Sequence, residues 1–80
     1  MNEANSITSP RRILNILEEI LLDPENFTAK KISHKLNIPL ATVYRHIETL
    51  CDERFLVASS NKNYITGPKI RNIILNSLPY

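Results

Sequence analysis

The sequence predicts a mainly helical domain with three core helices, one small β-hairpin and a C-terminal helix. Three regions repeat apolar residues at helical spacing, and two short runs rich in β-branched and aromatic residues flank a polar loop. The chain has 80 residues, of which 42% are hydrophobic and 22% are charged, as is typical of one folded domain with a thin core. We expect this domain at residues 10–78, after a flexible leader at residues 1–9.

The first helix is expected over residues 10–22. Ser9 and Pro10 suit a helix start, because the serine side chain can cap the first turn and proline has no N–H to leave unpaired. Asp23-Pro24 ends the helix, because the residue before a proline avoids the helical conformation. The apolar stripe comprises Ile13, Leu14, Ile16, Leu17, Ile20 and Leu21.

The second and third helices are expected over residues 28–36 and 39–52. Thr28 can cap the second helix, and Asn37 suits the left-handed position that closes it. A turn this short between two helices predicts a helix-turn-helix, in which the small Ser33 lets the helices approach closely. The buried stripe of the third helix comprises Val43, Ile47 and Leu50.

A β-hairpin, the wing, is expected over residues 55–66. Its strands are Phe55 to Ala58 and Tyr64 to Thr66, and its polar tip carries Lys62. Gly67-Pro68 breaks the chain, and a C-terminal helix follows over residues 68–78.

Charge alternates along the chain although the net charge is only +2. Residues 28–46 and 54–80 each hold four basic side chains and no acidic one, whereas residues 1–27 and 47–53 are each net acidic. If folding brings the two basic segments to one side, that side attracts a polyanion such as nucleic acid. Chance clustering of ten basic residues is the alternative.

Several classes of function are excluded by what the sequence lacks. One cysteine, Cys51, allows no internal disulfide, and together with His34 and His46 it is too little for a cysteine-rich zinc site. We expect Cys51 to be a packing residue and His46 to be a packing or surface residue rather than a DNA contact, and we expect no enzyme activity, no cofactor and no metal. The apolar stretch at 13–22 is broken by charged residues, and the N-terminus has no secretory pattern, so we expect a cytoplasmic protein without a membrane partner.

Four short segments carry a resemblance to a known family. They are Arg12-Ile13-Leu14 with Ile16-Leu17, Ile38-Pro39 with Thr42-Val43-Tyr44-Arg45, Leu50 before Phe55-Leu56-Val57, and Tyr64 to Ile70. In this order and spacing they resemble a winged helix-turn-helix, most closely the N-terminal DNA-binding domain of IclR-type transcription regulators. The resemblance implies sequence-specific binding of double-stranded DNA in transcription regulation.

The chain departs from that family at four points. Ala41 stands where a serine or threonine is usual, Thr66 where leucine is preferred, and Arg54 where a glycine usually closes the third helix. Arg54 can take the left-handed conformation itself, and a different turn at this point is the alternative. IclR-type regulators also carry a larger C-terminal effector-binding domain, which these 80 residues do not contain. A fragment of such a regulator and a free-standing winged helix both fit.

The first residues of the third helix are expected to reach base edges in the major groove. Arg45 can bind guanine or a phosphate, with an ion pair to Glu48 as the alternative, and Tyr44 can instead pack against the wing. The expected base contacts are Leu40, Ala41, Thr42, Tyr44 and Arg45. The expected contacts to the DNA backbone are Arg11, Arg12, Thr28, Lys30, Lys31, Asn61, Lys62 and Asn63.

A homodimer is expected, because a thin core has little room for the apolar stripe of the last helix and two recognition helices would then meet successive turns of DNA. An entirely intramolecular role of that stripe is the alternative. The candidate dimer contacts are Ile70, Ile73, Ile74 and Leu78. The competing function is a winged-helix protein-docking module, which would not need to keep acidic residues out of residues 28–46.

Overall fold

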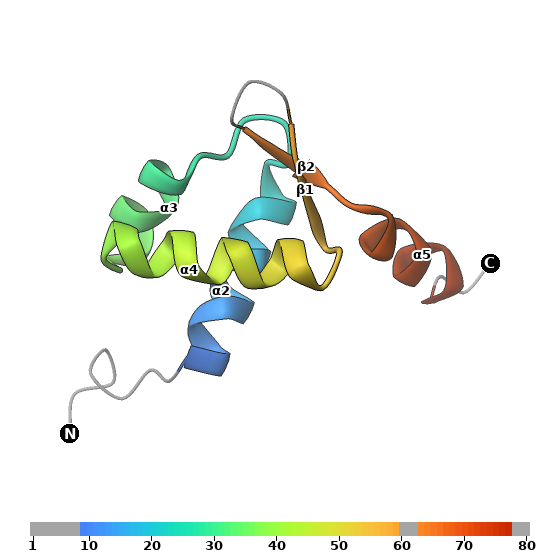
Figure 1. Ribbon diagram of the computed structural model, residues 1–80, viewed down its shortest axis with the longest axis horizontal. Helices are drawn as coiled ribbons and strands as arrows, with labels where there is room; N and C mark the ends of the chain where they lie inside the picture. Colours follow the sequence, from blue (N-terminus) through green and yellow to red (C-terminus); the bar gives the residue numbers. More distant parts are fainter. Residues whose placement is uncertain (1–8, 60–62, 78–80) are drawn as a thin grey trace. The chain divides into compact units, whose positions relative to one another are not determined.

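The computed structural model describes residues 9–59 and 63–77 of the chain. The elements are helices α2 (Ser9–Leu22), α3 (Ala29–Leu36) and α4 (Leu40–Asp52), strands β1 (Leu56–Ala58) and β2 (Tyr64–Thr66), and helix α5 (Pro68–Ser77) (Figure 1). Four helices with one two-stranded antiparallel hairpin confirm the predicted class, a mainly helical winged helix-turn-helix. The chain divides into two compact units, residues 1–46 and 47–80.

The first unit has its core on one side of α2. Ile16 and Ile20 are completely buried there, and Ala29 and Ile32 of α3 are also buried. Leu14 and Leu21, which we expected in the same apolar stripe, are 64% and 41% exposed. Only one face of a helix can point into a core this small, so part of the predicted stripe remains on the surface. Of the expected leader, only Ser9 lies within the described residues, where it is the first residue of α2.

Helix α3 begins and ends at the predicted caps. Thr28 has extended backbone, and its Oγ1 accepts a hydrogen bond from Lys31 N at 3.1 Å. Asn37 closes the helix in the left-handed conformation, with φ 56°. Both predictions are confirmed, and the chain leaves α3 by a sharp turn.

Ser33 stabilises this turn through hydrogen bonds of its carbonyl and hydroxyl groups, in addition to being small. Its carbonyl oxygen accepts hydrogen bonds from the backbone N–H groups of Asn37 and Ile38. Its hydroxyl donates in return to the Ile38 carbonyl oxygen at 2.6 Å. The Pro39 carbonyl then accepts from Thr42 N at 2.9 Å, which starts α4. The path from α3 into α4 is therefore fixed by backbone groups on both sides of the turn.

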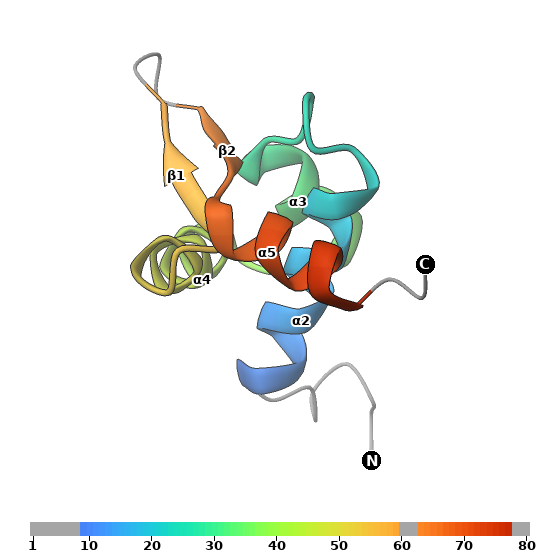
Figure 2. The same cartoon turned by 90° about the vertical axis from the view of Figure 1, so that its right-hand side faces the viewer.

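The second unit is organised around the hairpin, from which α5 continues after β2 (Figure 2). Strands β1 and β2 pair Leu56 with Thr66, Val57 with Ile65, and Ala58 with Tyr64. Within residues 47–59 and 63–77, the buried side chains are Ile47, Leu50, Leu56 and Ile70.

Arg54 and Gly67 shape the base of the hairpin. Arg54 has a left-handed backbone, with φ 69°. Gly67 donates its N–H to the Phe55 carbonyl at 2.7 Å, and a Cβ at Gly67 would lie only 2.4 Å from the Arg54 carbonyl oxygen. Gly67 is thus a position of close backbone approach, and α5 starts directly after it at Pro68.

Candidate nucleic-acid interface

The start of α4 presents three of the five expected base-reading side chains at the surface. Ala41, Tyr44 and Arg45 are exposed, and Leu40 is half-buried. Thr42 is only 9% exposed, so it has little surface to offer a base, and its role as a base contact stays a prediction. The low exposure follows from helical periodicity, because Thr42 lies one turn before the buried His46 on the same side of the helix.

His46 is a buried packing residue, one of the two roles expected of it. It is 8% exposed, and among the described residues no hydrogen-bond partner approaches its Nε2 atom. Its pKa lies below the ordinary histidine value, first because burial disfavours the charged ring and then because Arg45 and Arg12 add positive charge nearby. Protonating this ring would place a third positive charge beside two arginines.

The basic side chains of the first unit differ in exposure and in whether an oxygen atom of the chain lies near their positive charge. Arg11, Thr28, Lys30 and Lys31 are exposed, whereas Arg12 is half-buried. Lys31 Nζ donates to the Asn26 carbonyl at 3.3 Å. No acidic residue lies in the first turn of α3, so its N-terminal end keeps the positive potential that an anion prefers.

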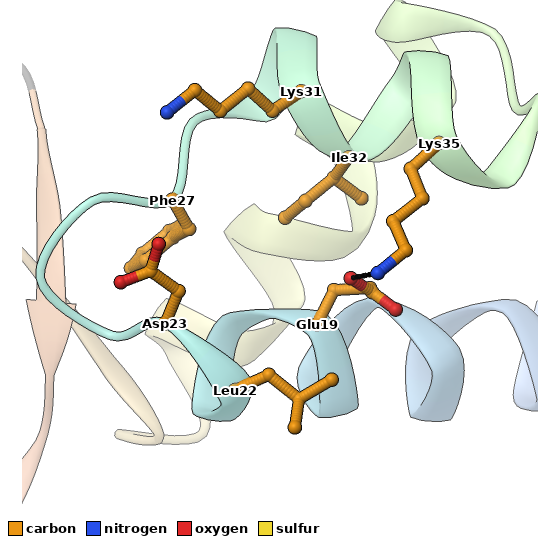
Figure 3. A pocket seen from close by; sticks show the side chains of 7 residues that line it. All are labelled: Glu19, Leu22, Asp23, Phe27, Lys31, Ile32 and Lys35. Atoms are coloured by element: carbon orange, nitrogen blue, oxygen red, sulfur yellow. Dashed lines mark ion pairs between the residues drawn. The ribbon is translucent and has the colours of Figure 1, made fainter.

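Lys35 is compensated by an acid from another helix. Its Nζ lies 2.9 Å from Glu19 Oε1 of α2, across a hollow of about 210 Å³ between α2 and α3 (Figure 3). The hollow is lined by Glu19, Leu22, Asp23, Phe27, Lys31, Ile32 and Lys35. Residues 28–46 hold no acid in sequence, yet folding brings Glu19 to them, a contact that sequence reasoning missed.

The second unit contributes the wing. Asn63 is exposed, and the other two expected wing contacts, Asn61 and Lys62, lie outside the described residues. Lys69 pairs with Glu53 at 3.7 Å and lies 5.2 Å from the centre of the Phe55 ring, so its charge is held at the base of the hairpin.

Cys51 is half-buried, in line with a packing role. Burial raises the pKa of its thiol, and the carboxylates of Asp52 and Glu48 raise it further, because a thiolate is disfavoured in apolar surroundings and beside negative charge. The side chain therefore stays a neutral thiol at physiological pH, which is the unreactive form.

The expected dimer contacts differ in how far their side chains are exposed. Ile70 is 8% exposed and belongs to the core, so it has little surface for a second copy, and its role as a dimer contact stays a prediction. Its position early in α5 explains this burial, because the chain has only just left the hairpin. Ile73 and Ile74 are each 47% exposed, and Leu78 lies outside the described residues.

The described residues offer neither a metal site nor a membrane span. No group of three or more His, Cys, Asp or Glu side chains within residues 9–59 and 63–77 could hold a metal ion. None of the helices seen in that part of the chain has the length and apolar character needed to cross a membrane.

Comparison with known proteins gives one match. A family model described as an HTH domain matches residues 12–70, which include the turn between α3 and α4, both strands and the start of α5. No curated protein and no solved structure matches the chain. The match covers most of the chain and supports a DNA-binding domain. The chain belongs to the helix-turn-helix (HTH) domain family.

Proposed function

We propose that this chain binds double-stranded DNA sequence-specifically and regulates transcription, with the start of α4 in the major groove. The observation that carries the proposal is the exposure of Tyr44 and Arg45 on the second helix of the helix-turn-helix. That helix is the one whose N-terminal residues read bases in this motif. The earlier resemblance to IclR-type regulators adds transcription control to the proposal.

Each exposed side chain at the start of α4 suits a different part of the DNA because of its chemistry. Arg45 can donate two hydrogen bonds to the O6 and N7 atoms of a guanine, which distinguishes that base from the other three. Ala41 offers a methyl group to a thymine methyl, and Tyr44 offers a ring and a hydroxyl to sugar or phosphate. Leu40 lies at the edge of this surface, and Thr42 adds little exposed area to it.

Contacts to the DNA backbone are proposed at two places. At the N-terminal end of α3, the exposed Thr28, Lys30 and Lys31 stand where backbone N–H groups and the helix dipole also favour a phosphate. At the wing, Asn61, Lys62 and Asn63 are proposed to contact backbone or minor groove. Such contacts supply affinity that weakens with salt, and they do not select a sequence.

A homodimer in the cytoplasm completes the proposal. Among the expected dimer contacts, Ile73 and Ile74 of α5 remain exposed and available to a second copy, and their neighbour Leu75 is 65% exposed. A dimer would present two recognition helices to two half-sites, so a selected DNA site should be close to a palindrome.

The test compares three substitutions on a selected DNA site and on a random duplex. Arg45→Ala should lose about 1–3 kcal/mol of binding to the selected site and should relax the preference for one base pair. Lys30→Ala should weaken binding to both duplexes equally, because a phosphate contact carries no sequence information. Lys35→Ala is the matched control, because that lysine is already paired with Glu19, and it should change binding much less.

Each outcome bears on a different part of the proposal. If Arg45→Ala binds the selected site as tightly as the parent chain, α4 does not read bases in the proposed way. If Lys30→Ala changes the preferred sequence, its assignment to phosphate is wrong.

A further inference from the structure

Helix α2 carries a row of exposed leucines that the core does not use. Leu14 is 64% exposed, Leu21 is 41% exposed and Leu22 is 68% exposed. Together with Leu17 they border an open hollow of about 450 Å³ along the helix. Exposed apolar surface concentrated on one helix indicates contact with another protein surface.

The spacing of these leucines fits a helix as the partner. Leu14, Leu17 and Leu21 follow one another by three and four residues, which is the apolar repeat of a coiled-coil seam. The buried Ile16 and Ile20 lie toward the other side of α2, so the helix has an inner stripe for its own core and an outer stripe beside it. Each leucine can insert between the side chains of a facing helix.

The charged residues beside the stripe of Leu14, Leu17 and Leu21, here called the seam, favour a second copy of α2 as the partner helix. Arg11 and Glu18 are both exposed and are seven residues apart, so they occupy the same flank of the seam at equivalent positions. When two identical helices pair antiparallel about a two-fold axis, the same flank of each meets the other. Arg11 of one copy then faces Glu18 of the other, and the symmetry makes this pair twice. A parallel pairing instead turns this flank toward the opposite flank of the partner helix, which carries Ile13 and Ile20 and no charge.

We propose that α2 is a self-pairing surface, on which two copies of the chain associate antiparallel through Leu14, Leu17 and Leu21, with an Arg11–Glu18 ion pair at each end. Under this assignment Arg11 binds the second copy and not a DNA phosphate. The surface is separate from Ile73 and Ile74 of α5.

The test is sedimentation of the full chain without DNA, so its outcome does not depend on the proposed function. Arg11→Glu or Glu18→Arg alone places like charges opposite each other at both ends of the seam. Each should raise the dissociation constant of the α2 pairing by about tenfold, because one substitution changes two symmetric pairs. The double variant, Arg11→Glu with Glu18→Arg, restores both pairs in reverse and should return the constant to within about threefold of the parent value.

Three further variants make the test specific. Glu25→Arg changes the charge by the same amount at an exposed site outside α2 and should leave association unchanged. Leu14→Gln alters the seam without altering charge and should weaken association, while circular dichroism should show the fold intact because this side chain is mostly exposed. Ile74→Gln removes an α5 contact and should leave the α2 pairing in place.

The proposal is overturned if the parent chain is monomeric at several hundred micromolar, or if Glu18→Arg and Glu25→Arg affect association equally. It is also overturned if the double variant fails to recover, or if Ile74→Gln alone abolishes association. In the last case the α5 dimer stands and the α2 pairing does not.

Discussion

Gly67 is the position at which the structure predicts the largest effect from the smallest change. In Gly67→Ala the added Cβ would lie 2.4 Å from the Arg54 carbonyl oxygen, 3.1 Å from the Arg54 carbonyl carbon and 3.2 Å from that of Phe55. All three are backbone atoms, so no side-chain rotation relieves the clash. Gly67 is also held in place by its hydrogen bond to the Phe55 carbonyl at 2.7 Å.

The magnitude follows from two opposing effects. Replacing glycine by alanine restricts the unfolded chain and by itself stabilises a protein by roughly 0.4–1 kcal/mol. Inserting a methyl group where there is no space costs about 1–3 kcal/mol, and here the neighbours are rigid, so the upper part of that range applies. We expect a net loss of about 2 kcal/mol in the free energy of unfolding. With a urea slope of about 1 kcal/mol/M for a chain of this size, the midpoint should fall by about 2 M.

Urea unfolding followed by circular dichroism measures this midpoint. Ile65→Thr is the control, because Ile65 is 53% exposed on the same hairpin and threonine keeps the β-branched shape. The control should stay within about 0.5 kcal/mol of the parent. An unchanged midpoint in Gly67→Ala would refute the close approach of Gly67 to Arg54.

Two further changes have expected outcomes in the first unit. Ser33→Ala removes the hydroxyl that donates to the Ile38 carbonyl, and it should cost about 1 kcal/mol in the free energy of unfolding, measured by the same titration. His46 should make stability depend on pH. Burial and the two nearby arginines lower its folded-state pKa, so the unfolded chain takes up the proton first as the pH falls through about 6.5. The free energy of unfolding should therefore be lower at pH 5.5 than at pH 7.5, and His46→Leu should show a smaller difference; equal pH dependence in both chains would exclude this role of His46.

Local chemistry made several features predictable from the sequence. Thr28 and Asn37 lie where a helix starts or stops, and their conformations depend on the few residues around them. The left-handed Arg54 could be anticipated only from the family resemblance, because it replaces a glycine there. The helix-turn-helix and the hairpin followed from the spacing of apolar residues between these signals. The exposure of Tyr44 and Arg45 followed as well, because the buried stripe of α4 defines its opposite side.

Features that depend on tertiary packing were not predictable in the same way. The Glu19–Lys35 pair joins two helices, and no local pattern assigns one residue to the other. Thr42 is polar and lies beside Val43, so only the rotation of α4 about its axis shows that its side chain is covered. The six apolar residues of the predicted α2 stripe cover more than one face, and the sequence does not show that Leu14 and Leu21 stay outside the core. Because Leu14 and Leu21 lie outside the core, they form part of the surface that we propose for self-pairing.

The most direct test of DNA binding is fluorescence anisotropy of a labelled mixed-sequence duplex, titrated with the chain at several salt concentrations. The proposed function predicts binding at low salt that weakens steeply as salt rises. The slope of log K against log salt should be about −0.9 for each phosphate contacted. Absence of binding at low salt, with circular dichroism showing a folded chain, would contradict the proposed function and favour a protein-docking role for this HTH domain.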